Sequence, residues 1–197
     1  FCLEAISETG ITDIAIIIGG IGSNKVRDYY GDGKKFGVKI QYVHDEERKG
    51  TAGSLYFLKQ QLSEDFVVMN ADLLTNINFD NLVDFHFHSN SKATMCVREF
   101  DFQVPYGVVN MHNDKVTSID EKPVHNFFIS AGIYMLNPSV LKYIPENSFF
   151  DMPTLLNNLI ESKEKVFPFP IREYWLDIGE IGSFNKANDE YDENFGK

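Results

Sequence analysis

Two aspartates of this chain each follow an apolar run. Asp72 ends the unalternating run 66–71, and Asp177 comes after Trp175 and Leu176. An unalternating run of β-forming residues predicts a strand that is covered on both faces, as in a parallel sheet between layers of helices. Ligands of open α/β sheets bind at the carboxyl ends of the strands, so a carboxylate there could hold a metal ion or a sugar hydroxyl. The alternative for Asp72 is an Asx-turn or helix-cap residue that only closes its strand.

Three further groups of residues suit a bound anion or sugar. Lys122 follows Glu121 and precedes Pro123; the cation could hold a phosphate and the acid a sugar hydroxyl, or the three could form a plain turn. Small residues at 130–132 interrupt an expected strand and would leave room for a ligand against the backbone. The glycines of 50–53 open an expected helix, where they would expose amide groups to a ligand or allow tight packing of the helix on a strand.

A glycine-rich stretch at 19–22 follows an isoleucine-rich strand expected at 13–18. Strand, loop and helix occur in the order of a dinucleotide-binding fingerprint, but Lys25 stands at the position of its third glycine. We therefore interpret this stretch as a plain strand-to-helix turn. His86 and His88 lie two apart in an expected helix, so they point to opposite sides and cannot share a metal ion. One core and one surface histidine are expected.

Composition sets limits on the class of protein. The 197 residues suit one domain, 43% of them are hydrophobic, and no apolar run approaches the length of a membrane span. A net charge of -11 argues against nucleic acid or an anionic membrane as the partner, because both need a basic surface. Cys2 and Cys96 have no companion ligands at metal spacing and are expected to be reduced thiols.

The periodicities predict strands and helices in near alternation, broken by one hairpin. The charged stretch 44–49 is expected to be solvated surface. Strands are expected at 13–18, 38–43, 66–71, 93–100, 127–136 and 166–169, with a short apolar run at 174–179 and a hairpin of 106–111 with 115–120. Helices are expected at 1–8, 50–61, 79–90, 138–143 and 151–163. A short helix is also expected from the glycine-rich stretch to about residue 30, and a last one after 174–179, through residue 191. The hairpin departs from strict βαβ order and predicts an antiparallel insert.

Six motifs in this order resemble the sugar-nucleotidyltransferase family, the nucleoside-diphosphate-sugar pyrophosphorylases. Each motif alone is weak, but together they cover nearly the whole chain; within the family, the mannose-1-phosphate guanylyltransferase-like members are most similar. The motifs are Gly50-Thr51-Ala52-Gly53, Asn70-Ala71-Asp72, Tyr106-Gly107-Val108-Val109, Glu121-Lys122-Pro123, Ser130-Ala131-Gly132 and Trp175-Leu176-Asp177-Ile178-Gly179.

The resemblance implies a role for each matching position. Asp72 and Asp177 would be a magnesium-binding pair, and Lys122 would hold the sugar phosphate. The acid that takes sugar hydroxyls would be Glu121. The sugar pocket would be lined by Tyr106, Gly107, Ala131 and Gly132. The nucleotide would lie against Gly50, Thr51 and Gly53, with Glu46 or Glu47 as a contact to the base.

The same resemblance implies a fold and a reaction. The fold would be a three-layer, Rossmann-like α/β fold with a mixed, mostly parallel sheet and an antiparallel hairpin insert. The reaction would join a nucleoside triphosphate and a sugar 1-phosphate into an NDP-sugar and pyrophosphate, with Mg²⁺ as cofactor, because a hard cation suits carboxylate and phosphate oxygens. A cytoplasmic protein is implied, without nucleic-acid or membrane partners; a homodimer is compatible with the family, although the residues themselves indicate no interface.

Departures from the family pattern bear on activity. The glycine-rich loop with an Arg, and the following Lys, that mark the family's first strand are missing, and the glycines at 19–22 do not replace them. Ala71 stands where the family has Gly, and Arg48-Lys49 replaces Pro-Leu. We therefore expect residues 1–197 to be one nucleotidyltransferase domain without its N-terminal phosphate-binding loop, a truncated form with little or no turnover.

Two other classes remain open. A non-catalytic relative that senses sugar nucleotides would keep the pocket without transferring; retention of Asp72 and Asp177 argues against it, and the missing loop leaves it open. A metal-dependent glycosyltransferase would present two carboxylates one residue apart at a strand end. The segment Asn70-Ala71-Asp72 offers only one, and the motif at 121–123 would be unexplained.

Overall fold

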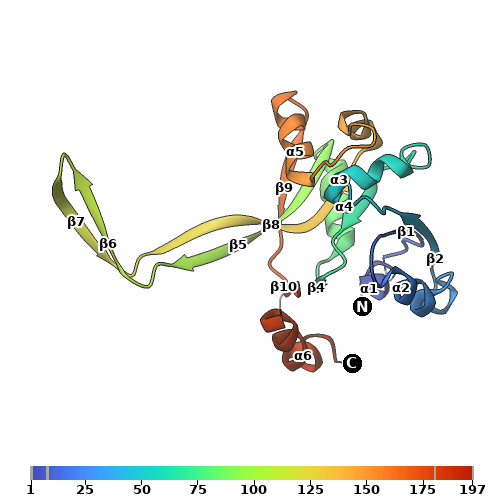
Figure 1. The fold of residues 1–197 in the computed structure, drawn as a ribbon, viewed down its shortest axis with the longest axis horizontal. Coiled ribbons are helices and arrows are strands. Elements are labelled where there is room, and N and C mark those ends of the chain that lie inside the picture. Colours follow the sequence, from blue (N-terminus) through green and yellow to red (C-terminus); the bar gives the residue numbers. More distant parts are fainter. Residues whose placement is uncertain (1, 8, 180, 197) are drawn as a thin grey trace.

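The computed structural model describes residues 2–7, 9–179 and 181–196 (Figure 1). The ten strands, in chain order, are β1 (Asp13–Ile18), β2 (Lys39–His44), β3 (Phe66–Met69), β4 (Leu73–Thr75), β5 (Ala93–Gln103), β6 (Gly107–His112), β7 (Lys115–Glu121), β8 (Val124–Leu136), β9 (Val166–Pro170) and β10 (Trp175–Asp177). The α-helices are α1 (Cys2–Ser7), α2 (Ser23–Tyr30), α3 (Gly50–Gly53), α4 (Phe79–His88), α5 (Met152–Glu161) and α6 (Ile181–Phe195), and 3-10 helices cover Lys34–Phe36, Ser54–Leu58 and Pro138–Tyr143.

The central sheet has the strand order β3-β8-β5-β9. Strand β8 runs antiparallel to both β3 and β5, and β9 is parallel to β5, so that three of the four strands share one direction. β1 and β2 form a separate parallel pair, and β4 pairs antiparallel with β10. The expected mixed, mostly parallel sheet with an antiparallel hairpin insert is confirmed.

Apolar side chains from both sides of the sheet form two cores. One lies against α5 and the 3-10 helix 138–143, where the side chains of Leu155, Leu159 and Leu136 are fully enclosed. The other lies between the sheet and α4, around Phe79, Leu82 and Ile133. Because β8 alternates its side chains between these layers, its inner half is buried on both faces, which explains its unalternating sequence.

Beyond the body, β5 and β8 continue as a two-stranded ribbon that ends in the β6–β7 hairpin. Figure 1 shows this part of the chain projecting from the rest of the molecule, and all of β7 is exposed. Residues 98–129 are called the arm below. A β-bulge between Met95 and Val97 marks its base. The hairpin turn is Asn113-Asp114, with φ of 47° and 62°, the two-residue turn that matches the twist of its strands.

Several expected boundaries were wrong. The helix expected at 50–61 is α-helical only to Gly53 and continues as a 3-10 helix to Leu58. Strand β3 is half-buried rather than covered on both faces, and it ends at Met69. β5 and β8 are longer than expected because their outer residues pair in the arm. Phe1 and Glu8, at the ends of the first expected helix, lie outside the described residues.

The described helices include none that combines the length and apolar character needed to cross a bilayer. β1, β2 and α2 form the N-terminal layer, and α6 lies at the opposite end of the chain beside β10 (Figure 1).

Candidate functional site

Asp72 and Asp177 come together because two distant segments pair. Asp177 stands opposite Leu73 in the β4–β10 pair, and the backbone N–H of Ile178 donates to the carbonyl of Asp72 at 2.8 Å. Both aspartates are exposed at the strand ends. The structure therefore brings Asp72 and Asp177, the two carboxylates singled out in the sequence, close to each other.

Gly179 shows how near the two carboxylates are to each other. A Cβ atom built at this glycine would lie 3.1 Å from Asp177 Oδ1 and 3.6 Å from Asp72 Oδ2. The backbone N–H of Gly179 donates to Asp177 Oδ1 at 2.8 Å, which orients that carboxylate. The glycine therefore leaves open the small volume that both carboxylates border.

The wall behind these aspartates is formed by the small residues of β8. Gly132 has φ of 71°, and a Cβ there would lie 2.9 Å from Asn70 Nδ2. The backbone N–H of Asn70 donates to the carbonyl of Gly132, and Trp175 Nε1 donates to the carbonyl of Ala131, both at 2.9 Å. The strand interruption expected at 130–132 is not found, because β8 is continuous there. Two segments, those of Asn70 and Trp175, instead approach the β8 backbone at this place.

These segments enclose a cavity of about 340 Å³, called the first cavity below. Two carboxylates, Asp151 and Asp177, border it, and its lining includes no Lys, Arg or His. The lining residues are Thr51, Asn70, Leu73, Ser130, Ala131, Gly132, Tyr134, Asp151, Pro153, Trp175 and Asp177.

The glycines of α3 allow close packing against the loop before α5. A Cβ at Gly50, whose φ is 82°, would lie 2.6 Å from Asp151 Oδ1, and a Cβ at Gly53 would lie 2.9 Å from the carbonyl of Ser148. Thr51 locks the contact: its N–H donates to Asp151 Oδ1 at 3.2 Å, and its Oγ1 accepts from the N–H of Met152 at 2.9 Å. The glycines therefore allow tight packing, as in the alternative interpretation, but against the loop before α5 and not against a strand.

Thr51 and Asp151 also border a second cavity, of about 320 Å³. Gly50 lines it, so the same turn both packs and faces open space. Arg48 supplies a cation on this side. The second cavity is lined by Ile17, Gly19, Asp45, Arg48, Gly50, Thr51, Phe149 and Asp151.

The sequence analysis missed Asp45. The stretch 44–49 was expected to be solvated, but Asp45 is only 5% exposed and Lys49 is buried as well. Asp45 Oδ2 accepts from the N–H of Lys49 at 2.7 Å and from Ser54 Oγ, whereas Oδ1 has no hydrogen-bond partner among the described residues. Burial acts to raise the pKa of Asp45, but these donors outweigh it and hold that pKa below its ordinary value.

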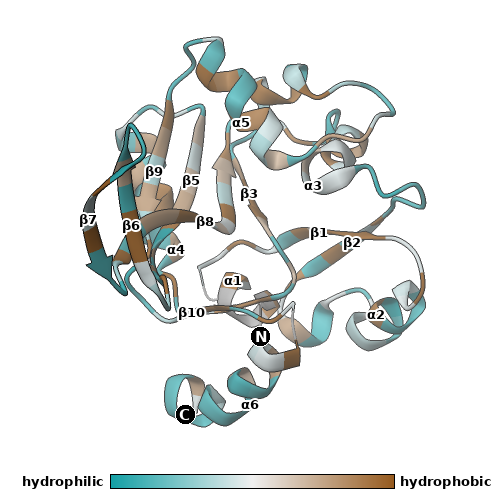
Figure 2. Cartoon of the chain, turned by 60° about the vertical axis from the view of Figure 1, so that its left-hand side comes forward, coloured by the Kyte–Doolittle hydropathy of each residue, from teal (hydrophilic) through white to brown (hydrophobic). Residues whose placement is uncertain are grey.

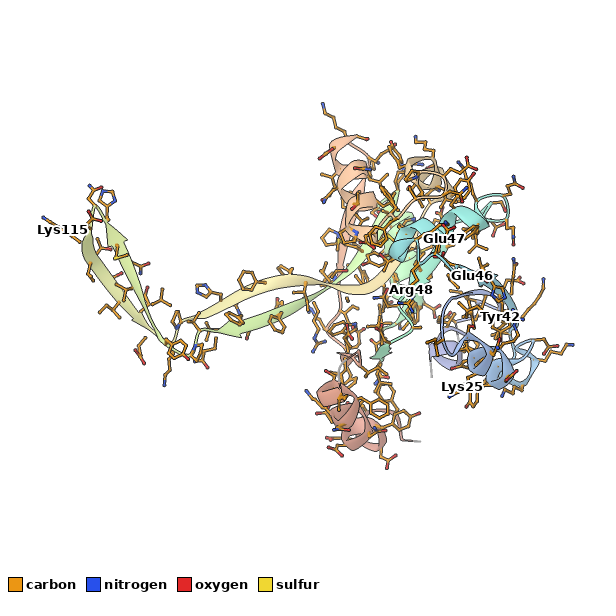
Figure 3. The ribbon with its side chains drawn as sticks, viewed as in Figure 1. Lys25, Tyr42, Glu46, Glu47, Arg48 and Lys115 are labelled. Atoms are coloured by element: carbon orange, nitrogen blue, oxygen red, sulfur yellow. The ribbon has the colours of Figure 1, made fainter. Side chains whose placement is uncertain are left out.

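The sequence offered one signal for the burial of Asp45, which is the small hydroxyl residue Ser54 nine positions later. This signal is weak. Glu46 and Glu47, the alternatives for a base contact, are exposed and line neither cavity. Glu47 instead forms an ion pair with Lys49. Figure 3 shows Glu46, Glu47 and Arg48 together on the body of the molecule.

Four expected site residues lie far from these cavities. Tyr106, Gly107, Glu121 and Lys122 are at the junction of the arm's ribbon with the β6–β7 hairpin, and Gly107 pairs with Glu121 there. Gln103 Nε2 donates to the carbonyl of Lys122 at 3.3 Å, at a corner where Lys122 has φ of 47°. Within one chain, the structure brings together Asp72, Asp177 and Gly132 but leaves these four residues apart from them.

Two carboxylates at strand ends, a mixed α/β sheet and two adjoining cavities define a Rossmann-like, ligand-binding α/β protein. The chain belongs to the nucleotidyl transferase family, whose family model matches residues 1–194. The sugar-nucleotidyltransferase resemblance drawn from the six motifs is confirmed.

Curated relatives extend the comparison. A mannose-1-phosphate guanyltransferase of Debaryomyces hansenii is 33% identical over 190 residues, which cover 92% of this chain and 52% of that protein. The mannose-1-phosphate guanylyltransferase catalytic subunit beta of Drosophila melanogaster is 30% identical over 189 residues, or 92% of this chain and 51% of that protein. The chain thus spans about half the length of the curated relatives it matches.

Solved structures share the fold. A chain from Bacillus anthracis, assigned as a glucose-1-phosphate thymidylyltransferase and crystallised with sucrose, superposes with a TM-score of 0.76 at 25% identity, over 99% of this chain and 82% of that one. HddC from Yersinia pseudotuberculosis superposes with a TM-score of 0.72 at 21% identity, over 96% and 83% of the two chains, and supports the fold alone.

Proposed function

We propose that this protein serves as a sugar-1-phosphate nucleotidyltransferase, which transfers a nucleoside monophosphate from an NTP to a sugar 1-phosphate and releases pyrophosphate. Guanylyl transfer to a hexose 1-phosphate is favoured, with thymidylyl or uridylyl transfer next. The observation that carries the proposal is the pair of cavities that share Thr51 and Asp151, with Asp177 in the lining of the first and Asp72 close to Asp177.

Family membership and the names of the relatives support the substrate class. The yeast and fly relatives are named for guanylyl transfer to mannose 1-phosphate, and the bacterial structure for thymidylyl transfer to glucose 1-phosphate. Two adjoining cavities suit two substrates that must meet. The second cavity, with Arg48 and the Gly50 turn, would take the nucleotide, and the first cavity would take the sugar phosphate.

The reaction suits a site without a nucleophilic side chain. An oxygen of the sugar phosphate attacks the α-phosphorus in line, the bond from that phosphorus to the bridging oxygen breaks, and pyrophosphate leaves. The protein's share is to position two anions and to neutralise charge. Lys122 would hold the sugar phosphate, and Glu121, Tyr106 and Gly107 would contact the sugar. These roles require the β6–β7 hairpin to lie against a first cavity.

Magnesium fits the carboxylates that are present. The described residues contain no cluster of three or more His, Cys, Asp or Glu side chains that could hold a metal ion. Mg²⁺ often takes only one or two carboxylates together with phosphate oxygens and waters, so Asp72 and Asp177 beside Gly179 are a suitable donor set. When bound, Mg²⁺ would neutralise the phosphates and fix their orientation. We also propose a cytoplasmic location for the protein.

Asp45 supports guanine as the base. Its Oδ1 is a buried, ionised acceptor without a partner among the described residues, and Asp45 borders the second cavity. A buried acceptor is stabilised by a ligand that donates hydrogen bonds. Guanine offers neighbouring N1–H and N2–H donors, whereas the corresponding edges of uracil and thymine offer one N–H between two carbonyl groups.

Calorimetric titration of the 197-residue chain tests the proposal, because binding requires no turnover. In the presence of Mg²⁺ the chain would be titrated with GTP, dTTP, UTP, CTP, ATP and their NDP-hexoses. We expect one guanosine ligand to bind more tightly than the others, and Asp177→Asn to weaken that binding by about tenfold or more, because the Mg²⁺-phosphate contact loses a ligand.

The matched control is Asp189→Asn, which removes an exposed carboxylate of α6 away from both cavities and should bind like wild type. A folded chain that binds no nucleotide or NDP-sugar would contradict the proposal. Tight binding by a longer form of the protein without pyrophosphate release would favour the sensing relative instead.

A further inference from the structure

The glycine-rich stretch at 19–22, which the proposed function leaves unused, packs against the charged loop at 44–49. The N–H of Asp45 donates to the carbonyl of Ile18 at 2.9 Å, and a Cβ atom built at Gly19 would clash with the carbonyl oxygen of Asp45. No side chain fits at residue 19, so the backbones of the two segments are in direct contact. The glycine stretch therefore serves as the surface on which the charged loop lies.

The next glycine places the side chain of Arg48. Gly20 has φ of 76°, and a Cβ there would lie 2.8 Å from Arg48 Nη2 and 3.6 Å from Nε. Arg48 itself has φ of 53°, a conformation that is rare for a residue other than glycine and that tends to occur at functional sites. Proline, which the family pattern has at this position, cannot adopt this φ. The guanidinium over Gly20 is thus a departure of this chain from that pattern.

The donors of this guanidinium are available to a ligand. In the part of the chain that the structure describes, Arg48 forms no ion pair, although the net charge is -11. The neighbouring Lys49 is buried and pairs with Glu47. Arg48 is exposed and is the one cation among the residues that line the second cavity.

The second cavity has apolar surface beside its charged groups. It is lined from β1 by Ile17 and from α3 by Gly50, and Figure 2 shows β1 in hydrophobic colours below α3. Phe149, which is 69% exposed, and Ile17, which is 38% exposed, supply the apolar lining. An aromatic and an aliphatic side chain next to polar groups suit a flat heterocycle with polar edges.

The charges of this cavity favour a neutral ligand group over a phosphate. Two carboxylates, Asp45 and Asp151, line it together with Arg48. Asp151 Oδ1 accepts from the N–H of Thr51, whereas Asp45 Oδ1 is buried without a partner among the described residues. A phosphate beside Arg48 would also face these carboxylates, whereas a neutral group can donate to Asp45 and accept from Arg48.

We propose that Arg48, held over Gly20, donates to O6 and N7 of a guanine base, while Asp45 Oδ1 accepts from N1–H or N2–H of the same base. This inference rests on the proposed function and makes Arg48 a residue that determines the choice of base. The acceptors N7 and O6 and the donors N1–H and N2–H follow one another along the edge of guanine, and the fork of an arginine matches the two acceptors. Adenine has a donor in place of O6, and pyrimidines have no N7, so both fit Arg48 less well.

Calorimetric titration of Arg48→Met with GTP and 7-deaza-GTP, both with Mg²⁺, tests this contact. The second ligand has a C–H group in place of N7 but keeps O6 and the three phosphates. We expect the wild-type chain to bind GTP about fivefold or more tightly than 7-deaza-GTP. The Arg48→Met variant should bind GTP about 10–100-fold more weakly than wild type and should bind the two ligands alike, because it lacks the guanidinium.

Two further variants separate the contact from charge. Arg172→Met removes an exposed arginine that lines neither cavity and should bind both ligands like wild type. Arg48→Lys keeps the positive charge without the fork and should still lack the preference for GTP over 7-deaza-GTP. If Arg48→Met weakened both ligands equally, Arg48 would contact the phosphates, and the proposed base contact would be overturned.

A matched pair of glycine variants tests the placement of the guanidinium. In Gly20→Ala the added methyl group would displace the end of the Arg48 side chain, whereas a Cβ at Gly22, with φ of 99°, would meet nothing within 4 Å. Both substitutions strain a positive φ, so strain alone affects them similarly. We expect Gly20→Ala to lose the preference for GTP over 7-deaza-GTP and Gly22→Ala to keep it, with unchanged circular dichroism in both.

The same titrations separate this inference from the proposed function. A wild-type chain that binds GTP and 7-deaza-GTP equally well would overturn the contact of Arg48 and leave the proposed function standing. Equal preferences in the two glycine variants would overturn the placement over Gly20. A folded wild-type chain that binds no nucleotide would overturn both the contact and the proposed function.

Discussion

At the scale of single residues, Asp45 combines burial, charge and an unpartnered oxygen. Asp45→Asn keeps an oxygen for the N–H of Lys49 and for Ser54 but turns an amide NH₂ toward the position of Oδ1. If guanine binds in the second cavity, this amide NH₂ group and an N–H group of the base, both donors, would then face each other. We expect guanosine ligands to bind about 10–100-fold more weakly, the loss of a charged hydrogen bond.

Calorimetry with GTP and ATP measures this effect. Glu46→Gln is the control, since Glu46 is exposed beside Asp45 and lines neither cavity. Equal losses for both nucleotides would show that Asp45 supports the loop at 44–49 without reading the base.

At the scale of elements, the packing of α3 on the loop before α5 depends on Gly50. In Gly50→Ala the added methyl group would meet Asp151 Oδ1 at 2.6 Å and the carbonyl of Phe150 at 2.8 Å, at a φ of 82°. We expect the free energy of unfolding to fall by about 1–3 kcal/mol, because overpacking and backbone strain act together. Urea denaturation followed by circular dichroism gives the value.

Gly182 offers the opposite case in the same chain. A Cβ there would meet nothing within 4 Å, and the residue lies in α6. Gly182→Ala should therefore raise the stability by about 0.5–1 kcal/mol, as helix propensity predicts. Equal effects of the two substitutions would mean that the contact at Gly50 is not tight.

The sequence predicted most elements but not their assembly. Period-2 and apolar runs identified β1, β6 and β7 nearly to the residue. The turn between the last two was expected at 112–114 and is formed by Asn113-Asp114. The family resemblance joined Asp72 and Asp177 in one hypothesis, and the β4–β10 pair places their segments side by side. Local patterns carry no information on which distant segments pair, so the length of the arm was missed.

The burial of individual polar residues was the other feature that the sequence analysis did not fully predict. One core and one surface histidine were expected in the helix, and this is confirmed, since His86 is buried and His88 is exposed. The burial of Asp45 and Lys49 was not expected, because both lie in a charged loop where single residues default to solvent. Their burial follows from tertiary contacts with Ser54 and Phe57, which no local pattern shows.

At the scale of the whole molecule, global stability should depend on His86. Its ring is buried between α4 and the sheet, with Nδ1 2.7 Å from Thr94 Oγ1 and Nε2 3.4 Å from Asp65 Oδ2. Burial lowers the pKa of His86 below 6.5, Asp65 opposes this shift, and Lys92 adds to it. Around and below pH 6.5 the unfolded chain then binds more protons than the folded one, so stability falls as the pH falls.

We expect the Tm to decline between about pH 7.5 and 5.5, by roughly 2–4 °C for each kcal/mol lost. His86→Gln should be less stable overall but should lose most of this pH dependence. His88→Gln, on the exposed side of α4, should keep it. An unchanged slope in the His86 variant would assign the pH dependence to other groups.

The two-residue turn at 113–114 also sets the order of events during synthesis. Gly107 pairs with Glu121 only fourteen positions away, and isolated hairpins form in about 1–10 μs. The body needs Phe66 to pair with Leu136, which is translated fifteen residues after Glu121, about 1–3 s at 5–20 residues per second. Each nascent chain thus presents a finished hairpin before it has a finished sheet.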